Sequence, residues 1–190
     1  IKAPGVVDAR LCISYLTIEN RGEIPHELRS LVGDWAFGCD VCQEVCPYNK
    51  TKATRSRWPE FSAEAGSGPY LDLVEVLEIR TDVEFERRFA GTPLTRPGRA
   101  GLLRNCCVAT GNLKLRRAAP ALLRCLMEDE SSLVRGHAAW ALGEIGGSSE
   151  ALREAAGVEH DPWCLEEIRL ALSGGVGGRA GAGTEGASVG

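Results

Sequence analysis

Three cysteines follow one another at gaps of two and three residues in the stretch Gly38-Cys39-Asp40-Val41-Cys42-Gln43-Glu44-Val45-Cys46-Pro47. A fourth cysteine, Cys12, precedes this stretch, and the next one along the chain is Cys106. Thiolates at such short spacings are typical metal ligands. The pattern therefore predicts a metal centre whose ligands come from two separated segments.

The spacing favours an iron–sulfur cluster over a single ion. It is the second half of the bacterial ferredoxin run C-x2-C-x2-C-x3-C-P, although Ala36 stands where the first cysteine of that run would be. In two-cluster ferredoxins the cysteine before the proline binds the other cluster. By that rule Cys12, Cys39 and Cys42 bind one cluster and Cys46 binds a second. Both clusters would need further cysteines, so we expect a fragment whose remaining ligands lie upstream of Ile1.

A structural zinc site is the alternative for the same four cysteines, because tetrahedral four-cysteine zinc sites are common and C-x2-C is their usual half. The proline after Cys46 and the three-residue gap before it favour iron–sulfur.

The composition supports a globular protein with reduced thiols. The 190 residues are 44% hydrophobic and include eight cysteines, which we interpret as metal ligands and core thiols of a cytoplasmic protein and not as a disulfide framework. No run of 18 apolar residues occurs, so no transmembrane helix is expected.

From about residue 97 the sequence becomes repetitive. Leu103–Gly111 aligns with Arg135–Gly143 at an offset of 32, and Leu165–Leu172 is a weaker third copy. Helices are expected between the copies, at about 117–127 and 149–156. Helix pairs at this period, with small residues where helices touch, are typical of HEAT-like α-solenoids. The cysteines within this region are predicted to be buried core residues: Cys106, Cys107, Cys125 and Cys164.

The predicted fold is therefore mainly α, with a ferredoxin-like iron–sulfur segment followed by HEAT-like α-solenoid repeats. We expect an iron–sulfur segment at 1–58, incomplete at its N-terminus, and a helical connector at 59–96. The repeats would occupy 97–172. The glycine-rich tail at 173–190 is expected to be disordered.

The connector and the first segment also carry local helix signals. A helix is predicted over 26–32, ended by Gly33. Thr81 and Glu84 fit a capping box at the start of another helix.

One basic block interrupts a net-acidic chain of formal charge −4. No acidic residue lies between Ala90 and Met127, so this block is a candidate for phosphate recognition in RNA. A solvated solenoid edge is the alternative. The predicted RNA-contacting residues are Arg96, Arg99, Arg104, Lys114, Arg116 and Arg117.

Four stretches together resemble the epoxyqueuosine reductase family: Cys12–Glu19, Gly38–Pro47, Phe89–Leu94 and Gly98–Asn105. The resemblance implies an oxidoreductase that converts epoxyqueuosine in tRNA to queuosine. It also implies cobalamin, two 4Fe–4S clusters that relay electrons to it, and HEAT-like repeats at the C-terminus.

The resemblance assigns roles to individual residues. Cys12, Cys39 and Cys42 would bind one cluster with an upstream cysteine, and Cys46 would complete the cluster nearer the cobalamin. Ser14 would touch the corrin ring, and the basic block would hold the anticodon stem-loop of a tRNA with a GUN anticodon.

Other expectations concern what the chain lacks. No catalytic residue is expected in it, because the family's proton-donating acid would lie upstream of Ile1, so the fragment alone would be inactive. A monomer that receives electrons from a donor protein or reductant is expected. Two other functions stay open: a different cobalamin and iron–sulfur reductase, similar to dehalogenases, and a non-catalytic zinc-bearing HEAT adaptor.

Overall fold

The structure is a computed structural model that describes residues 5–6, 8–54, 56–62, 65, 67–68 and 70–174. Every regular element within these ranges is a helix, which confirms the mainly α fold. The α-helices are α1 (His26–Val32), α2 (Val41–Glu44), α3 (Pro47–Thr51), α4 (Leu73–Leu77), α5 (Asp82–Phe89), α6 (Gly98–Asn112), α7 (Ala119–Glu128), α8 (Ser132–Ile145), α9 (Ser149–Val158) and α10 (Pro162–Leu172).

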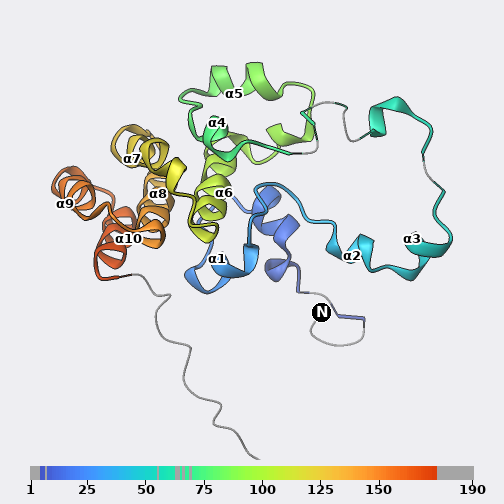
Figure 1. The fold of residues 1–190 in the computed structure, drawn as a ribbon, viewed down its shortest axis with the longest axis horizontal. Helices are drawn as coiled ribbons and strands as arrows, with labels where there is room; N and C mark the ends of the chain where they lie inside the picture. Colours follow the sequence, from blue (N-terminus) through green and yellow to red (C-terminus); the bar gives the residue numbers. More distant parts are fainter. Residues whose placement is uncertain are drawn as a thin grey trace, which may run out of the picture.

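Helices α6 to α10 form the solenoid that the repeat predicted. Helix α8 packs against α6 on one side and against α10 on the other, while α7 and α9 lie on the outer side of this row (Figure 1). The expected helices at about 117–127 and 149–156 correspond to α7 and α9.

Two glycines at the same repeat position set the spacing of the central row. A Cβ atom on Gly111 of α6 would lie 3.1 Å from Cα of Ala141 in α8, and one on Gly143 of α8 would lie 3.0 Å from Cα of Ala171 in α10. Gly111 and Gly143 are 32 positions apart, which is the offset of the sequence repeat. The repeat in sequence is therefore a repeat in helix contact, with no room for a side chain at either position.

The first part of the chain packs on the free side of α6. The π-helix η2 (Tyr15–Glu19) and α1 lie beside α6, and the 3-10 helix η1 (Ala9–Leu11) packs on η2, while α2 and α3 extend away from α6 (Figure 1). Helix α1 ends at Gly33, whose φ is +64°, as expected for a residue that stops a helix.

Helices α4 and α5 cover another side of α6. The capping box of α5 is present, since Thr81 accepts from the Glu84 N–H and the Glu84 carboxylate accepts from the Thr81 N–H.

One hydrophobic core runs through both parts, from Leu16 and Ile24 through α6 to Ile168 in α10. The four cysteines predicted to be core residues are at most 1% exposed, which confirms that prediction: Cys106, Cys107, Cys125 and Cys164. Among the described residues, no helix has the length and apolar character needed to cross a membrane. The predicted disordered tail falls outside the described residues from position 175 onward, and the domain boundaries stay predictions.

The close approach at Gly143 makes a stability prediction. A Gly143→Ala substitution would place a Cβ atom 2.8 Å from Cβ of Ala171. Because both sides of this contact belong to packed helices, we expect the free energy of unfolding to fall by about 1–3 kcal/mol. Urea unfolding of the full chain measures this.

Gly157 in α9 provides the control, because a Cβ atom there would meet nothing within 4 Å. Gly157→Ala should raise the free energy of unfolding by roughly 0.5 kcal/mol, since alanine is the better helix former. Equal effects of the two substitutions would contradict the packing described here.

Candidate metal centre

Cys12 lies at the junction of two short helices. Asp8 caps η1 by accepting from the Arg10 N–H at 3.2 Å, and the Cys12 N–H closes that turn on the Ala9 carbonyl at 3.0 Å. The Cys12 carbonyl in turn accepts from the Leu16 N–H at 2.9 Å. The backbone on both sides of Cys12 is thus fixed while its side chain is exposed.

The second cysteine segment begins at a glycine with a left-handed backbone. Gly38 has a φ of +69°, a value that side chains disfavour, and it turns the chain into Cys39. The Asp40 carbonyl accepts from the N–H groups of Gln43 and Glu44 at 2.8 and 2.9 Å, and so begins the short helix α2 that carries Cys42.

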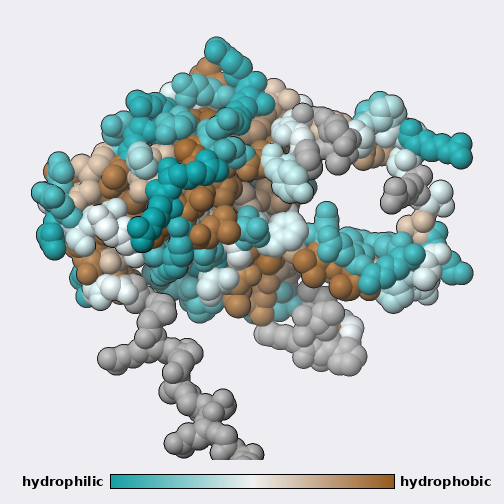
Figure 2. All heavy atoms as spheres, in the orientation of Figure 1, coloured by the Kyte–Doolittle hydropathy of each residue, from teal (hydrophilic) through white to brown (hydrophobic). Residues whose placement is uncertain are grey.

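Cys46 lies beyond the end of α2. It has extended backbone angles, φ −65° and ψ 122°, and Pro47 after it begins α3. Cys46 is thus the residue that precedes α3, whereas Cys42 lies within α2. Valine side chains accompany these cysteines at the surface, since Val41 is 48% and Val45 62% exposed, and Figure 2 shows apolar atoms around α2.

Hydrogen bonds join the Cys12 segment directly to the Cys39 segment. The Ser14 hydroxyl donates to the Cys39 carbonyl at 3.2 Å. The Thr17 hydroxyl accepts from the Gly38 N–H at 3.0 Å and donates to the Ile13 carbonyl at 2.8 Å. The structure therefore brings together two of the predicted ligand segments, which are 25 residues apart where Ser14 meets Cys39.

The eight cysteines divide into two groups by environment, and none forms a disulfide. The four predicted ligands are exposed or half-buried: Cys12, Cys39, Cys42 and Cys46. The other four are buried, and burial raises the pKa of the Cys125 thiol to about 12 and raises the pKa of the other three as well. Those four are protonated at neutral pH and unsuited to bind metal, because the thiolate is the ligand.

A zinc ion bound by all four predicted ligands would need the sulfurs around one point, about 2.3 Å from the metal. Among the described residues, no group of three or more histidine, cysteine or acidic side chains is arranged to hold one metal ion. The four predicted ligands come from two segments of the chain and are exposed or half-buried, and both properties suit thiolate ligands of a metal centre.

The predicted RNA contacts of Arg99 and Arg104 are wrong, because both side chains are buried. Arg99 is 3% exposed and makes a bidentate pair with Asp129, at 2.7 and 3.0 Å, which raises the pKa of the guanidinium. Arg104 is fully buried and donates to the carbonyls of Leu16 and Asn20 at 2.8 and 2.9 Å. The stretch 90–127 contains no acidic residue, but the fold brings acceptors from other parts of the chain next to these two arginines.

The other four predicted RNA-contacting residues are exposed: Arg96, Lys114, Arg116 and Arg117. Three of them have acidic neighbours, since Arg96 pairs with Glu19, Lys114 with Glu144, and Arg117 with Asp72 at 3.4 Å. In these residues the positive charge is accessible but partly neutralised.

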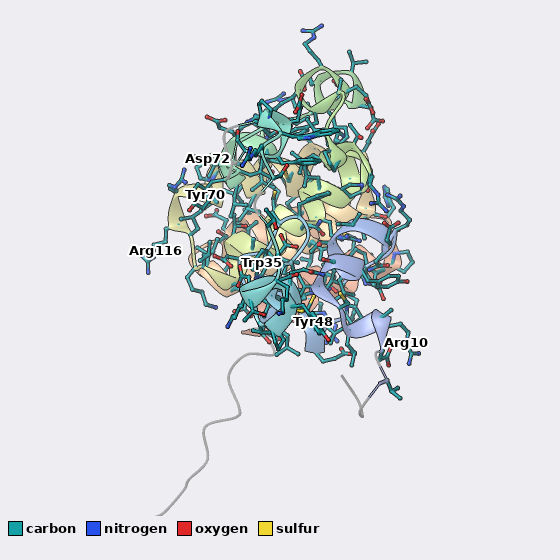
Figure 3. The ribbon with its side chains drawn as sticks, turned by 90° about the vertical axis from the view of Figure 1, so that its right-hand side faces the viewer. Arg10, Trp35, Tyr48, Tyr70, Asp72 and Arg116 are labelled. Atoms are coloured by element: carbon teal, nitrogen blue, oxygen red, sulfur yellow. The ribbon has the colours of Figure 1, made fainter. Side chains whose placement is uncertain are left out.

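Two adjoining cavities open near this exposed basic group. One of about 610 Å³ is lined by Trp35, Tyr70 and Arg117 among others, and one of about 550 Å³ shares Phe37, Tyr70 and Leu71 with it. In Figure 3 Tyr70 and Arg116 lie on the same side of the view. The sequence analysis assigned no site here, although aromatic residues flank the cysteine stretch at positions 35, 37 and 48.

Asn105 is a further residue that the sequence analysis did not assign. It is fully buried in α6 and its amide reaches the backbone of both cysteine segments. The available signal was a pair of polar residues, Arg104 and Asn105, between the apolar residues 102–103 and 106–109 of this helix.

Two family models match the chain. Residues 1–49, which hold all four predicted ligands, match the 4Fe–4S double cluster binding domain, and residues 99–173 match HEAT repeats. The first part of the chain is therefore an iron–sulfur cluster-binding segment, and the solenoid is a HEAT-repeat region.

Curated relatives agree with this division. The epoxyqueuosine reductase of Xanthomonas campestris is 41% identical over 148 residues, which are 77% of this chain and 40% of that protein. The one from Bacillus subtilis is 34% identical over 175 residues, which are 91% of this chain and 43% of that protein. The chain thus spans less than half the length of these relatives.

A solved structure shares the fold. The crystal structure of an epoxyqueuosine reductase with an epoxyqueuosine-modified stem loop of tRNA-Tyr matches with a TM-score of 0.77 and 32% identity, over 90% of this chain and 45% of that one. Similarity in sequence, in both domain types and in three dimensions leads to one conclusion: this chain belongs to the epoxyqueuosine reductase family.

Proposed function

We propose that this chain is the part of an epoxyqueuosine reductase that binds two 4Fe–4S clusters and contacts the tRNA anticodon stem-loop. The observation that carries the proposal is the link between Cys12 and Cys39 segments through Ser14 and Thr17, in a chain that matches a double cluster domain followed by HEAT repeats. The reaction would be the reduction of epoxyqueuosine in tRNA to queuosine.

In this proposal the cysteines divide between two clusters. Cys12, Cys39 and Cys42 bind the first cluster together with a cysteine outside this chain, because the first two lie on joined segments and Cys42 follows one helical turn later. Cys46, beyond α2 and before Pro47, serves the second cluster. When bound, the clusters supply one-electron transfer to the reductase.

Ser14 limits how this chain could contact a corrin ring. Its hydroxyl hydrogen is donated to the Cys39 carbonyl, so Ser14 could contact a cobalamin only by accepting a hydrogen bond or through its apolar atoms. The cobalamin domain, the catalytic acid and the docking site for an electron donor would be supplied by protein outside this chain.

Exposed cations and aromatic side chains support tRNA as the partner. Arg116 and Arg117 lie at the turn before α7, and Arg117 shares a cavity with Trp35 and Tyr70. RNA loops are recognised through phosphates and through unpaired bases that stack on aromatic side chains. We propose that this surface holds the stem-loop of a tRNA with a GUN anticodon, in a cytoplasmic and monomeric enzyme.

The cluster assignment predicts how iron is lost on substitution. The full-length gene product, purified without oxygen, should contain about eight irons with matching sulfide. Cys42→Ser should remove the first cluster and lower iron to about four, and Cys46→Ser should remove the second with a similar loss. Iron and sulfide analysis with electron paramagnetic resonance of the reduced protein measures both.

Cys107→Ala is the control, because Cys107 is a fully buried thiol of α6 and should leave the iron content unchanged. One zinc and no iron in the wild-type protein would reject the cluster proposal and favour a zinc-bearing HEAT adaptor. A full complement of iron in the Cys42→Ser protein would reject the ligand assignment.

The RNA proposal predicts a change in salt dependence. Arg116→Gln combined with Arg117→Gln should weaken binding of a tRNA-Tyr anticodon stem-loop and reduce the slope of log affinity against log salt by about 2, since two phosphate contacts are lost. Fluorescence anisotropy at several salt concentrations gives the slope.

Arg153→Gln is the matched control, because Arg153 is an exposed arginine like the other two but lies on α9, outside the proposed RNA-binding surface. It should leave affinity and slope unchanged. An unchanged slope in the Arg116 and Arg117 double variant would show that this basic group does not contact the RNA.

A further inference from the structure

Helix α6 places two consecutive polar side chains inside the core. Arg104 and Asn105 are both fully buried, and their neighbours Leu103 and Cys106 are fully buried as well. Burying a charge and an amide is costly unless their hydrogen bonds are satisfied. The partners of these two side chains therefore show what this part of α6 stabilises.

Asn105 bridges the two cysteine segments. Its Nδ2 donates to the Thr17 carbonyl at 2.7 Å and to the Ala36 carbonyl at 2.8 Å. Thr17 lies in η2, five residues after Cys12, and Ala36 lies three residues before Cys39. A single amide thus holds the backbone of both segments at a fixed separation.

Arg104 fixes the orientation of that amide. Its Nε and one terminal nitrogen donate to Oδ1 of Asn105 at 3.0 and 2.8 Å, so the Asn105 oxygen is committed to Arg104 and its nitrogen to the two carbonyls. Arg104 also donates to the carbonyls of Leu16 and Asn20 in the Cys12 segment. Burial and the nearby Arg21 lower the pKa of Arg104 to about 10, which leaves it charged at neutral pH.

We infer that Asn105, oriented by Arg104, is a positioning residue for the first iron–sulfur cluster. It fixes the separation of the Cys12 and Cys39 segments, so that thiolates from both can bind one cluster. This inference rests on the proposed function, because it requires Cys12 and Cys39 to share a cluster.

The physical reason is the cost of assembling ligands from two segments. A cluster needs its thiolates at set separations, and ordering two loops for this purpose costs conformational entropy. If the separation is already fixed by the protein, that cost is met in folding and not at cluster binding. Outer-shell partners of metal ligands act in this way, and their loss typically costs about 10–100-fold in metal affinity.

Asn112 offers a closely matched comparison within the same helix. Its Nδ2 also donates to two carbonyls of the first segment, those of Arg29 and Gly33, both at 2.7 Å. These carbonyls belong to α1 and the residue after it, which carry no cysteine. Asn105 and Asn112 thus make the same kind of tie, but only that of Asn105 joins the segment of Cys12 to the segment of Cys39.

The experiment compares Asn105→Leu with Asn112→Leu in the full-length, anaerobically purified holoprotein. We measure iron release to a chelator, each variant at the same interval below its own melting temperature, together with the paramagnetic resonance spectrum of the reduced protein. Asn105→Leu should release iron roughly tenfold to a hundredfold faster than Asn112→Leu, with a change confined to one cluster signal.

Asn105→Asp tests the same tie with less change of shape, in case Asn105→Leu does not fold. Aspartate keeps an oxygen that accepts from Arg104 but removes the Nδ2 that donates to the carbonyls of Thr17 and Ala36. It should also release iron faster than Asn112→Leu.

Three results decide between the possibilities. Equal release rates for Asn105→Leu and Asn112→Leu, or a wild-type rate for Asn105→Asp, would overturn the positioning role while leaving a loaded wild-type protein and the proposed function intact. A wild-type holoprotein without any cluster would overturn both.

Discussion

The buried charge of Arg104 is the constraint on which the arrangement of this chain depends. A guanidinium inside a helical core is tolerated only when acceptors surround it, and here they are backbone carbonyls of the segment that carries Cys12. Arg104 therefore fixes the first segment in one position against α6. Asn105 also fixes the Cys39 segment, so the packing of α6 and the placement of the cysteines depend on one hydrogen-bond network.

Helix α6 can hold the two cysteine segments in place because the solenoid fixes α6 from its other side. The contact of Gly111 with Ala141 leaves no space for α6 to shift against α8. A buried charge pair also joins the first segment to the last helix of the solenoid, since Arg29 of α1 makes a bidentate pair with Glu167 of α10 at 2.7 and 2.8 Å. Removing one member of this pair would leave a buried charge without a partner. The pair therefore specifies how α1 packs against α10 more than it adds stability.

Features governed by local pattern were predictable from the sequence. The cysteine spacing indicated a cluster site, the offset of 32 located the solenoid helices, and the small buried cysteines were assigned to the core correctly. The basic block was partly misread, because charge along the sequence does not reveal partners in space. Arg99 finds Asp129, and Arg104 finds carbonyls more than 80 residues away in sequence. Asn105 was missed for the same reason, since the importance of a buried amide depends on which backbone it reaches.

The most direct test is the position of iron in the full-length protein, located by anomalous diffraction at the iron edge from crystals grown without oxygen. We expect one cluster bonded to the sulfurs of Cys12, Cys39 and Cys42 and another bonded to Cys46, with the Asn105 amide still joining the carbonyls of Thr17 and Ala36. A single metal ion held by all four cysteines, or a cluster that Cys12 does not contact, would contradict the shared site on which these proposals rest.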